Sequence, residues 1–149
     1  MDFRLNLDGE SVASTEPQQP LRVEPTTPVR ELLAPLAENP LGCVLICRDE
    51  LLIGLFTHRD AVRLLASEAD LDCAIQNVMV ADPVCIATTE TLGAAIGKMS
   101  SGGFRQLPVV DAAGRPVGLL TVDMILRYLV HHFPDAVYTL PSEAHQSTQ

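Results

Sequence analysis

The sequence is poor in basic and aromatic residues. Its 149 residues include 10 basic side chains, only one of them a lysine (Lys98), against 19 acidic ones, so the formal net charge is −9, and tryptophan is absent. Such a chain repels phosphate, and we expect no nucleic-acid partner. No apolar run approaches the ~20 residues of a membrane-spanning helix. The N-terminus lacks the basic-then-apolar pattern of a secretory signal. We expect a cytoplasmic protein with no membrane association.

Motifs of catalysis and metal binding are also missing. The sequence contains no G-x-S-x-G, H-E-x-x-H, P-loop or G-x-G-x-x-G pattern. The cysteines lack C-x-x-C spacing, and Cys43 and Cys47 would lie ~13 Å apart on a strand. His131 and His132 are adjacent, so on a helix they diverge by ~100° and cannot chelate one metal together. Ser101–Gly103 is expected to end a helix. We expect no catalytic residues, no metal site and no enzyme activity.

The most informative feature present is an internal repeat of about 60 residues. Gly54, Thr57 and Arg63 recur 64 residues later as Gly118, Thr121 and Arg127. Upstream, 44–47 aligns with 107–110 at a spacing of 63, with the extra residue in the turn 111–114. Two such copies fill nearly the whole chain. The composition, with 47% hydrophobic and 19% charged residues, is that of a folded protein.

Each copy predicts the same β-α-β-β-α order of elements, which makes the fold class α+β. The predicted strands are 21–23, 43–47 and 51–56 in the first copy and 84–87, 107–110 and 116–120 in the second. Thr27 with Pro28, and Thr91, are expected to begin the first helix of each copy. The closing helices are expected at about 59–67 and 123–132. Their core faces are predicted to hold Ala61, Leu64 and Leu65, and Ile125, Leu126 and Leu129.

These spacings divide the chain into four parts. We expect an N-terminal segment at 1–10, a first repeat at 11–75, a second repeat at 76–134 and a C-terminal tail at 135–149. A β-α-β-β-α unit of this size buries its sheet poorly alone, so we expect the two copies to pack on each other.

The repeated pattern Gly-hydrophobic-hydrophobic-Thr-x-x-Asp, at a strand-to-helix junction, resembles the tandem CBS (cystathionine β-synthase-type) domain pair, or Bateman module. The resemblance covers roughly 11–134. Within it, 78–84 looks like the family's usual opening segment, and 104–110 looks like the segment that the family has before the second strand of a repeat. It implies two repeats packed sheet-to-sheet with pseudo-twofold symmetry and two equivalent clefts. It also implies a homodimer, commonly a flat disc, and clefts that bind adenosine-containing ligands.

The residues around Thr57 fit such a cleft. Thr57 can cap the helix that follows, whose N-terminus favours phosphate. Asp60 lies one turn later and can accept both ribose hydroxyls, while His58 and Arg59 supply positive charge. By resemblance, the second repeat completes the cleft: Val80, Cys85 and Ile86 would meet the adenine, and the backbone around Phe104 and Arg105 would close the far wall.

Three observations argue against a nucleotide site or limit it. Thr57-x-x-Asp60 is also a near match to a capping box, which alone can account for the pair. In the second copy Met124 occupies the position of Asp60, and Asp123 lies one residue early, so a carboxylate there points elsewhere. In addition, 39–43 has no basic residue to reach phosphates, whereas Arg105 serves the other cleft. We therefore expect at most one nucleotide per chain, with little dependence on phosphate.

The sequence thus predicts a stand-alone regulatory module that binds an adenosine-containing ligand at Asp60 and signals through dimer or partner association. AMP, ADP, ATP and S-adenosylmethionine are not distinguished, and the protein target is unknown. The alternative is a ligand-free dimerisation and interaction scaffold. Fold-level resemblance alone does not decide between them.

Overall fold

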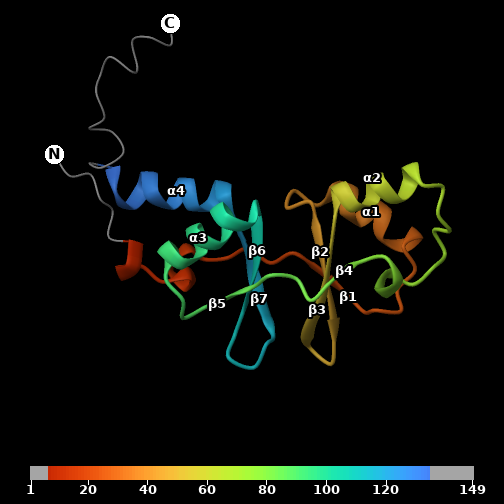
Figure 1. The fold of residues 1–149 in the computed structure, drawn as a ribbon, viewed down its shortest axis with the longest axis horizontal. Helices are drawn as coiled ribbons and strands as arrows, with labels where there is room; N and C mark the ends of the chain where they lie inside the picture. The colour runs from red at the N-terminus through yellow and green to blue at the C-terminus, as the bar shows by residue number, and fades with distance from the viewer. Residues whose placement is uncertain (1–6, 135–149) are drawn as a thin grey trace, which may run out of the picture.

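The chain forms two halves that lie side by side (Figure 1). The computed structural model describes residues 7–134; the C-terminal tail predicted at 135–149 lies outside this range. The first half consists of β1 (Leu21–Val23), α1 (Arg30–Glu38), β2 (Cys43–Arg48), β3 (Leu51–Thr57) and α2 (His58–Ala66). The second half consists of β5 (Ile86–Ala87), α3 (Leu92–Gly102), β6 (Gln106–Val110), β7 (Pro116–Thr121) and α4 (Val122–His132). The α+β class and the β-α-β-β-α order are therefore confirmed.

Both halves contain a mixed sheet built in the same way. In the first sheet β1 pairs in parallel with β2, and β2 pairs in antiparallel with β3. In the second, β5 pairs in parallel with β6, and β6 in antiparallel with β7. One register shift interrupts each antiparallel pair, at Ile46/Cys47 and at Val109/Val110. The two copies thus repeat even a local irregularity.

The segment that opens each repeat crosses to the sheet of the other repeat. β4 (Val80–Ala81) precedes the second half but pairs with β3, with Leu55 opposite Val80. In the same way Gln18, which precedes β1, exchanges two backbone hydrogen bonds with Leu119 of β7, at 3.2 and 2.7 Å. The halves are therefore tied to each other by backbone pairing on both sides.

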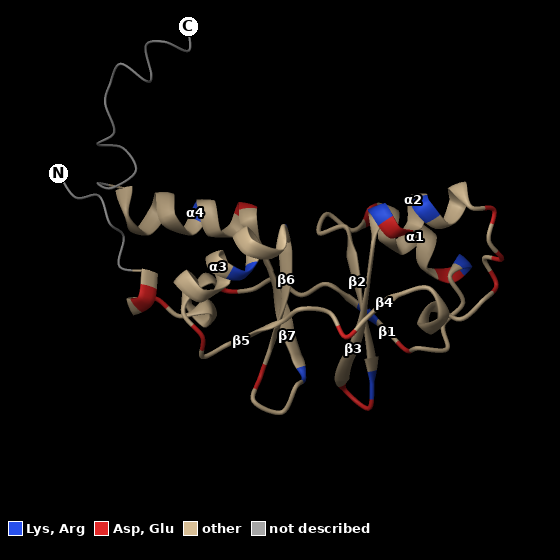
Figure 2. Cartoon of the chain, in the orientation of Figure 1, with Lys and Arg blue, Asp and Glu red and all other residues tan. Residues whose placement is uncertain are grey.

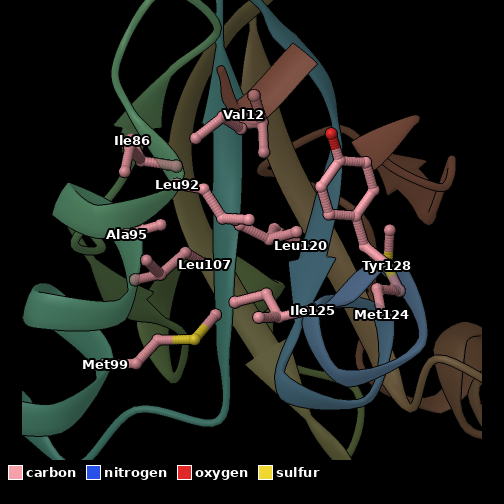
Figure 3. Packing of buried hydrophobic residues seen from close by; sticks show 11 residues of the cluster. Val12, Ile86, Leu92, Ala95, Met99, Leu107, Leu120, Met124, Ile125 and Tyr128 are labelled. Carbon is pink, nitrogen blue, oxygen red and sulfur yellow. The ribbon is translucent and has the colours of Figure 1, made fainter. Parts of the chain in front are cut away.

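The crossing also exchanges core residues. Val12, in the short 3₁₀ helix η2 (Val12–Thr15), is buried in the core of the second half, and Ile75, in η3 (Ile75–Asn77), is buried in the core of the first. Figure 3 shows Val12 beside side chains of α3, β7 and α4. Burying a side chain of this size stabilises the fold by about 1.5–3 kcal/mol. Each half therefore needs residues that precede the other half in the sequence.

The two sheets also meet directly. Cys43 and Leu45 of β2 and Leu119 of β7 form a buried apolar cluster between the halves. At the far end of the sheets, the Leu52 N–H donates to the Gly114 carbonyl at 3.3 Å. This packing confirms the predicted sheet-to-sheet arrangement.

Three helices begin at a threonine that caps them. The hydroxyls of Thr57, Thr91 and Thr121 accept hydrogen bonds from the backbone N–H three residues later, at 3.3, 3.0 and 3.1 Å. Thr91 therefore begins α3 as predicted. The end of α3 is also as predicted. The helix ends at Gly102, and Gly103 adopts the left-handed conformation, with φ 70°, that favours glycine after a helix.

The predicted start of α1 at Thr27 and Pro28 is wrong. The helix begins at Arg30, after Val29, and has no side-chain cap. The preceding residues pair instead with the segment 71–75, which leads from α2 to η3. Pro28 forms a bridge with Ala74, and the Arg30 N–H donates to the Leu71 carbonyl at 2.8 Å. Backbone groups from a distant segment therefore take the place of the local cap.

The predicted core faces of α2 and α4 are also partly wrong. Ala61 and Ile125 are buried, but Leu65 and Leu126 are 51% and 56% exposed. Each helix packs on its sheet through a narrower stripe than its apolar pattern indicates. Val62 and Val122 are exposed as well, and Figure 1 shows α2 and α4 along one edge of the molecule. These four exposed side chains give this edge of the molecule an apolar surface.

No helix among residues 7–134 is both long enough and apolar enough to cross a membrane.

Candidate functional site

Asp60 is held at the start of α2 by a complete capping box. Its Oδ2 atom accepts hydrogen bonds from the Thr57 N–H at 2.9 Å and from the Thr57 hydroxyl at 3.0 Å. The Thr57 hydroxyl in turn accepts from the Asp60 N–H. Among residues 7–134, nothing donates to Asp60 Oδ1. The carboxylate is therefore both a structural cap and a fixed acceptor with one oxygen available.

A cavity of about 280 Å³ lies beside this carboxylate. Its polar side chains, Asp60, Arg63 and Ser67, share one face of α2 because they are three and four residues apart. Its apolar walls are Phe56, Leu64 and Val78. Of the nine predicted site residues, only Asp60 lines this cavity. Arg63 is not among the residues predicted from the sequence, although its helical spacing from Asp60 could have indicated it.

His58 and Arg59 lie differently from each other. His58 Nε2 is 2.6 Å from the Leu36 carbonyl oxygen at the end of α1, so the ring joins the two helices of the first half. Arg59 is exposed and, within 7–134, takes part in no ion pair. Figure 2 shows basic and acidic residues next to each other on α2. Of these two residues, Arg59 is therefore the one whose side chain is available to a ligand.

The predicted adenine contacts lie on the crossing strand and just after it. Val80 is exposed on β4, opposite Leu55. The Cys85 Sγ donates to the Pro83 carbonyl at 3.1 Å, and burial raises the pKa of this thiol although Lys98 opposes the shift. The Ile86 side chain is only 1% exposed, in the second core. Val80 therefore offers the more accessible apolar side chain.

Phe104 and Arg105 lie just before β6, which begins at Gln106. Phe104 lines an apolar groove of about 370 Å³ between α3 and α4, together with Ile96, Met99, Val122 and Leu126. The Arg105 carbonyl accepts from the Val122 N–H at 3.0 Å, and the side chain is exposed. The structure therefore does not bring these two residues into the cavity beside Asp60.

The equivalent cavity in the second half has a different chemistry. It measures about 300 Å³, and Met124 and Arg127 take the places of Asp60 and Arg63. Asp123 is not among its lining residues and forms an ion pair with Arg127 at 2.5 Å. Tyr128 stacks on His132 with ring centroids 4.2 Å apart, and its hydrogen bond to Glu10 raises its pKa. The helix carboxylate at the position of Asp60 is missing here, and the carboxylate that lines this cavity, Glu16, comes from the segment before β1 instead.

Another hollow, of about 600 Å³, lies at the β2–β3 turn, where Arg22 and Arg48 alternate with Glu24, Asp49 and Glu50. Its charges are of both signs, and it contains none of the predicted site residues. Within the described part of the chain, no three His, Cys, Asp or Glu residues are grouped as a metal site.

Two repeats with this topology, each with a strand ending in a capping threonine, define a tandem CBS domain pair. The CBS domain family matches residues 12–67 and 75–131, and the chain belongs to that family. Figure 1 shows the pseudo-symmetric halves that correspond to these two matches.

Solved structures and curated sequences show the same pair. The CBS domain protein PAE2072 from Pyrobaculum aerophilum, complexed with AMP, is 23% identical with a TM-score of 0.71 and covers 81% of this chain and 98% of its own. CBSX2 in complex with AMP is 26% identical with a TM-score of 0.71, over 83% and 98%. An uncharacterised 17.7 kDa protein from Acidianus ambivalens is 28% identical over 109 residues, 72% of this chain.

The curated relatives are longer than the matched region. The chain spans 66% of the Acidianus protein and 32% of the arabinose 5-phosphate isomerase KdsD from Francisella tularensis, to which it is 27% identical over 106 residues, 70% of this chain. Sequences similar to this chain thus make up most of one curated relative and about a third of another.

Proposed function

We propose that this CBS pair is a regulatory, non-catalytic module that binds one adenosine-containing ligand per chain in the cleft at Asp60. The observation that carries the proposal is the fixed Asp60 carboxylate, whose Oδ1 atom faces no donor among residues 7–134 and which lines a cavity. A carboxylate so placed can accept both ribose hydroxyls without losing its role as a cap. Because Met124 replaces it in the second half, we propose one ligand rather than two.

The residues proposed for the cleft come from both repeats. Thr57, Asp60 and Arg59 form the ribose side, and His58 fixes the start of α2 through the Leu36 carbonyl. Val78, which lines the cavity, and the exposed Val80 on β4 form the side contributed by the second repeat, whereas Phe104 lines the separate groove between α3 and α4. Such a ligand would bridge the halves, so its binding would bias their relative position.

Similar proteins support this ligand class. The matched structures include complexes with AMP, one of the cytosolic domain of the Mg²⁺ channel MgtE with ATP (26% identical, TM-score 0.63), and one of the MJ0100 CBS pair with 5′-methylthioadenosine and S-adenosyl-L-methionine (22%, 0.71). These ligands share adenosine and differ beyond it. The proposal therefore specifies adenosine first, with AMP, ADP, ATP and S-adenosylmethionine as candidates.

The apolar edge of α2 and α4 supports a homodimer. Val62, Leu65, Val122 and Leu126 are large apolar side chains exposed on these helices, and such patches mark interaction surfaces. We propose that the dimer transmits ligand binding to a protein target. The same surface favours the second candidate function, a scaffold that dimerises without any ligand.

A thermal-shift panel separates the two candidates. Wild type and Asp60→Ala are compared with adenine nucleotides, guanine nucleotides and S-adenosylmethionine, with and without Mg²⁺. A ligand at about 100 times its Kd adds ~2.7 kcal/mol, which raises the Tm by roughly 5–10 °C. A rise specific to adenosine compounds and lost in Asp60→Ala supports the module. A flat panel with the dimer mass intact would leave the scaffold.

A further inference from the structure

The two repeats place an arginine at the same position but give it different neighbours. Arg127 of α4 forms an ion pair with Asp123, four residues earlier, at 2.5 Å. In α2 the position that corresponds to Asp123 is Arg59, so the neighbour four residues before Arg63 has the same charge. Within 7–134 no carboxylate lies within ion-pair distance of Arg63. The first repeat has lost the pairing that the second repeat keeps.

The carboxylate of the first repeat does not compensate for this loss. Asp60, one residue after Arg59, points its Oδ2 atom at the Thr57 N–H and hydroxyl. Arg63 and Asp60 line the same cavity without forming an ion pair. Arg59 and Asp60 lie in the first turn of α2 and Arg63 in its last turn, and the three together carry a net charge of +1 in a chain of net charge −9. This is a local preference for an anion.

We infer that Arg63 binds the phosphate of the ligand in the Asp60 cleft, and that the ligand is therefore a nucleoside phosphate such as AMP. The inference rests on the proposed function and narrows it, because S-adenosylmethionine and free nucleosides lack the group that Arg63 requires. It reverses the expectation of little phosphate dependence, which rested on the absence of a basic residue from 39–43 and on the place of Arg105 in the other cleft.

The geometry fits a ribose phosphate. Three residues of α-helix rise about 4.5 Å, so Asp60 and Arg63 present an acceptor and a cation about one turn apart on the same wall. A guanidinium binds phosphate oxygens in a bidentate manner, with charge-assisted hydrogen bonds. The cavity of about 280 Å³ is slightly below the usual ~300–1,000 Å³ of small-ligand pockets. It can hold the ribose phosphate while the base extends past Val78 towards the crossing segment.

Calorimetric titration of the full chain with adenosine, AMP and S-adenosylmethionine tests this inference. Wild type, Arg63→Gln and Arg127→Gln are compared; Arg127 is the matched control because it occupies the same position in the other repeat. A hydrogen bond to a charged group contributes about 1.5–3 kcal/mol. We therefore expect wild type and Arg127→Gln to bind AMP roughly 10- to 100-fold more tightly than adenosine, and Arg63→Gln to bind both equally.

Salt provides a readout that a merely structural arginine would not change. The AMP affinity of wild type should fall as ionic strength rises, and that of Arg63→Gln should stay nearly constant. Arg63 is exposed, so its replacement should leave the melting curve of the unliganded protein in place. Equal affinity of wild type for adenosine and AMP, or an AMP preference retained by Arg63→Gln, would overturn the inference while the adenosine site stands. No binding of any of the three ligands would overturn the proposed function and this inference together.

Discussion

Gly118 of β7 lies against Pro17 of the crossing segment: a Cβ atom on Gly118 would come within 2.7 Å of the Pro17 Cβ atom and 2.9 Å of its carbonyl oxygen. Gly54 has the same relationship to the Met79 side chain, where a Cβ atom would meet Sδ, Cε and Cγ. The glycine of the repeated Gly-hydrophobic-hydrophobic-Thr motif is therefore explained by packing. It leaves space for the opening segment of the other repeat.

The first prediction contrasts these two glycines. Gly118→Ala should destabilise the fold by about 1–3 kcal/mol, the usual cost of overpacking, because the obstacle includes backbone atoms. Gly54→Ala should cost less, because the flexible Met79 side chain can move. Gly97→Ala is the control: a Cβ atom there meets nothing within 4 Å, and alanine should stabilise α3 by roughly 0.5–1 kcal/mol. Urea unfolding measures all three. A Gly118→Ala variant as stable as wild type would contradict the close packing of Pro17 against β7.

The second prediction separates the two roles of Asp60. Asp60→Ala and Thr121→Ala each remove one helix cap and should each lower the free energy of unfolding by ~1 kcal/mol. Only Asp60→Ala should also remove the ligand-induced rise in Tm, because Thr121 begins the helix of the half in which Met124 takes the place of Asp60. Thermal melts with and without AMP measure both effects. Loss of the ligand response in both variants would mean that general destabilisation, not the carboxylate, is responsible.

The third prediction concerns alkaline pH. Burial, with a smaller contribution from Asp60, raises the pKa of the Cys43 thiol to about 12, whereas an unfolded thiol titrates near ~8.5. The neutral thiol of the folded state therefore contributes stability that is complete below ~8.5 and is lost as the pH rises towards 12. Between pH 8.5 and 10 the free energy of unfolding should fall by up to ~1.4 kcal/mol per pH unit from this group. Urea unfolding of Cys43→Val over this range should show a shallower slope; an unchanged slope would exclude Cys43 as the cause.

The fourth prediction tests the dimer surface. Leu65→Asp and Leu126→Asp should convert the proposed dimer to a monomer in analytical ultracentrifugation, with circular dichroism unchanged, because both side chains are half-exposed. Leu51→Asp is the matched control: Leu51 is also exposed but lies at the start of β3, away from α2 and α4. A wild-type monomer, or a dimer that survives both substitutions, would rule out this surface.

What the sequence could predict of the fold was local. The caps at Thr57, Thr91 and Thr121 depend on residues three positions apart, so each helix start follows from its own sequence. The repeat itself followed from the recurrence of Gly54 and Thr57 as Gly118 and Thr121. These signals do not depend on the rest of the chain.

What could not be predicted depends on contacts between the repeats. Pro28 pairs with Ala74 and so moves the start of α1, and Val12 is buried in the core of the other half. Neither follows from periodicity, because the partners are distant in sequence. The role proposed for Arg63 could not be predicted for a related reason. An arginine that recurs in both copies is typical of an ordinary surface position, and only the structure shows that Arg127 forms an ion pair with Asp123 whereas Arg63 has no such partner within 7–134.

Amide chemical-shift mapping of the ¹⁵N-labelled chain titrated with AMP tests the central claim most directly, because it reports where the ligand binds. The account predicts saturable shifts at Thr57–Arg63 and Val78, and little change at the equivalent residues Thr121–Arg127. In Asp60→Ala these shifts should disappear at the same ligand concentration. Shifts centred on Thr121–Arg127, or an unchanged spectrum at saturating AMP, would contradict the assignment of the Asp60 cleft as the ligand site.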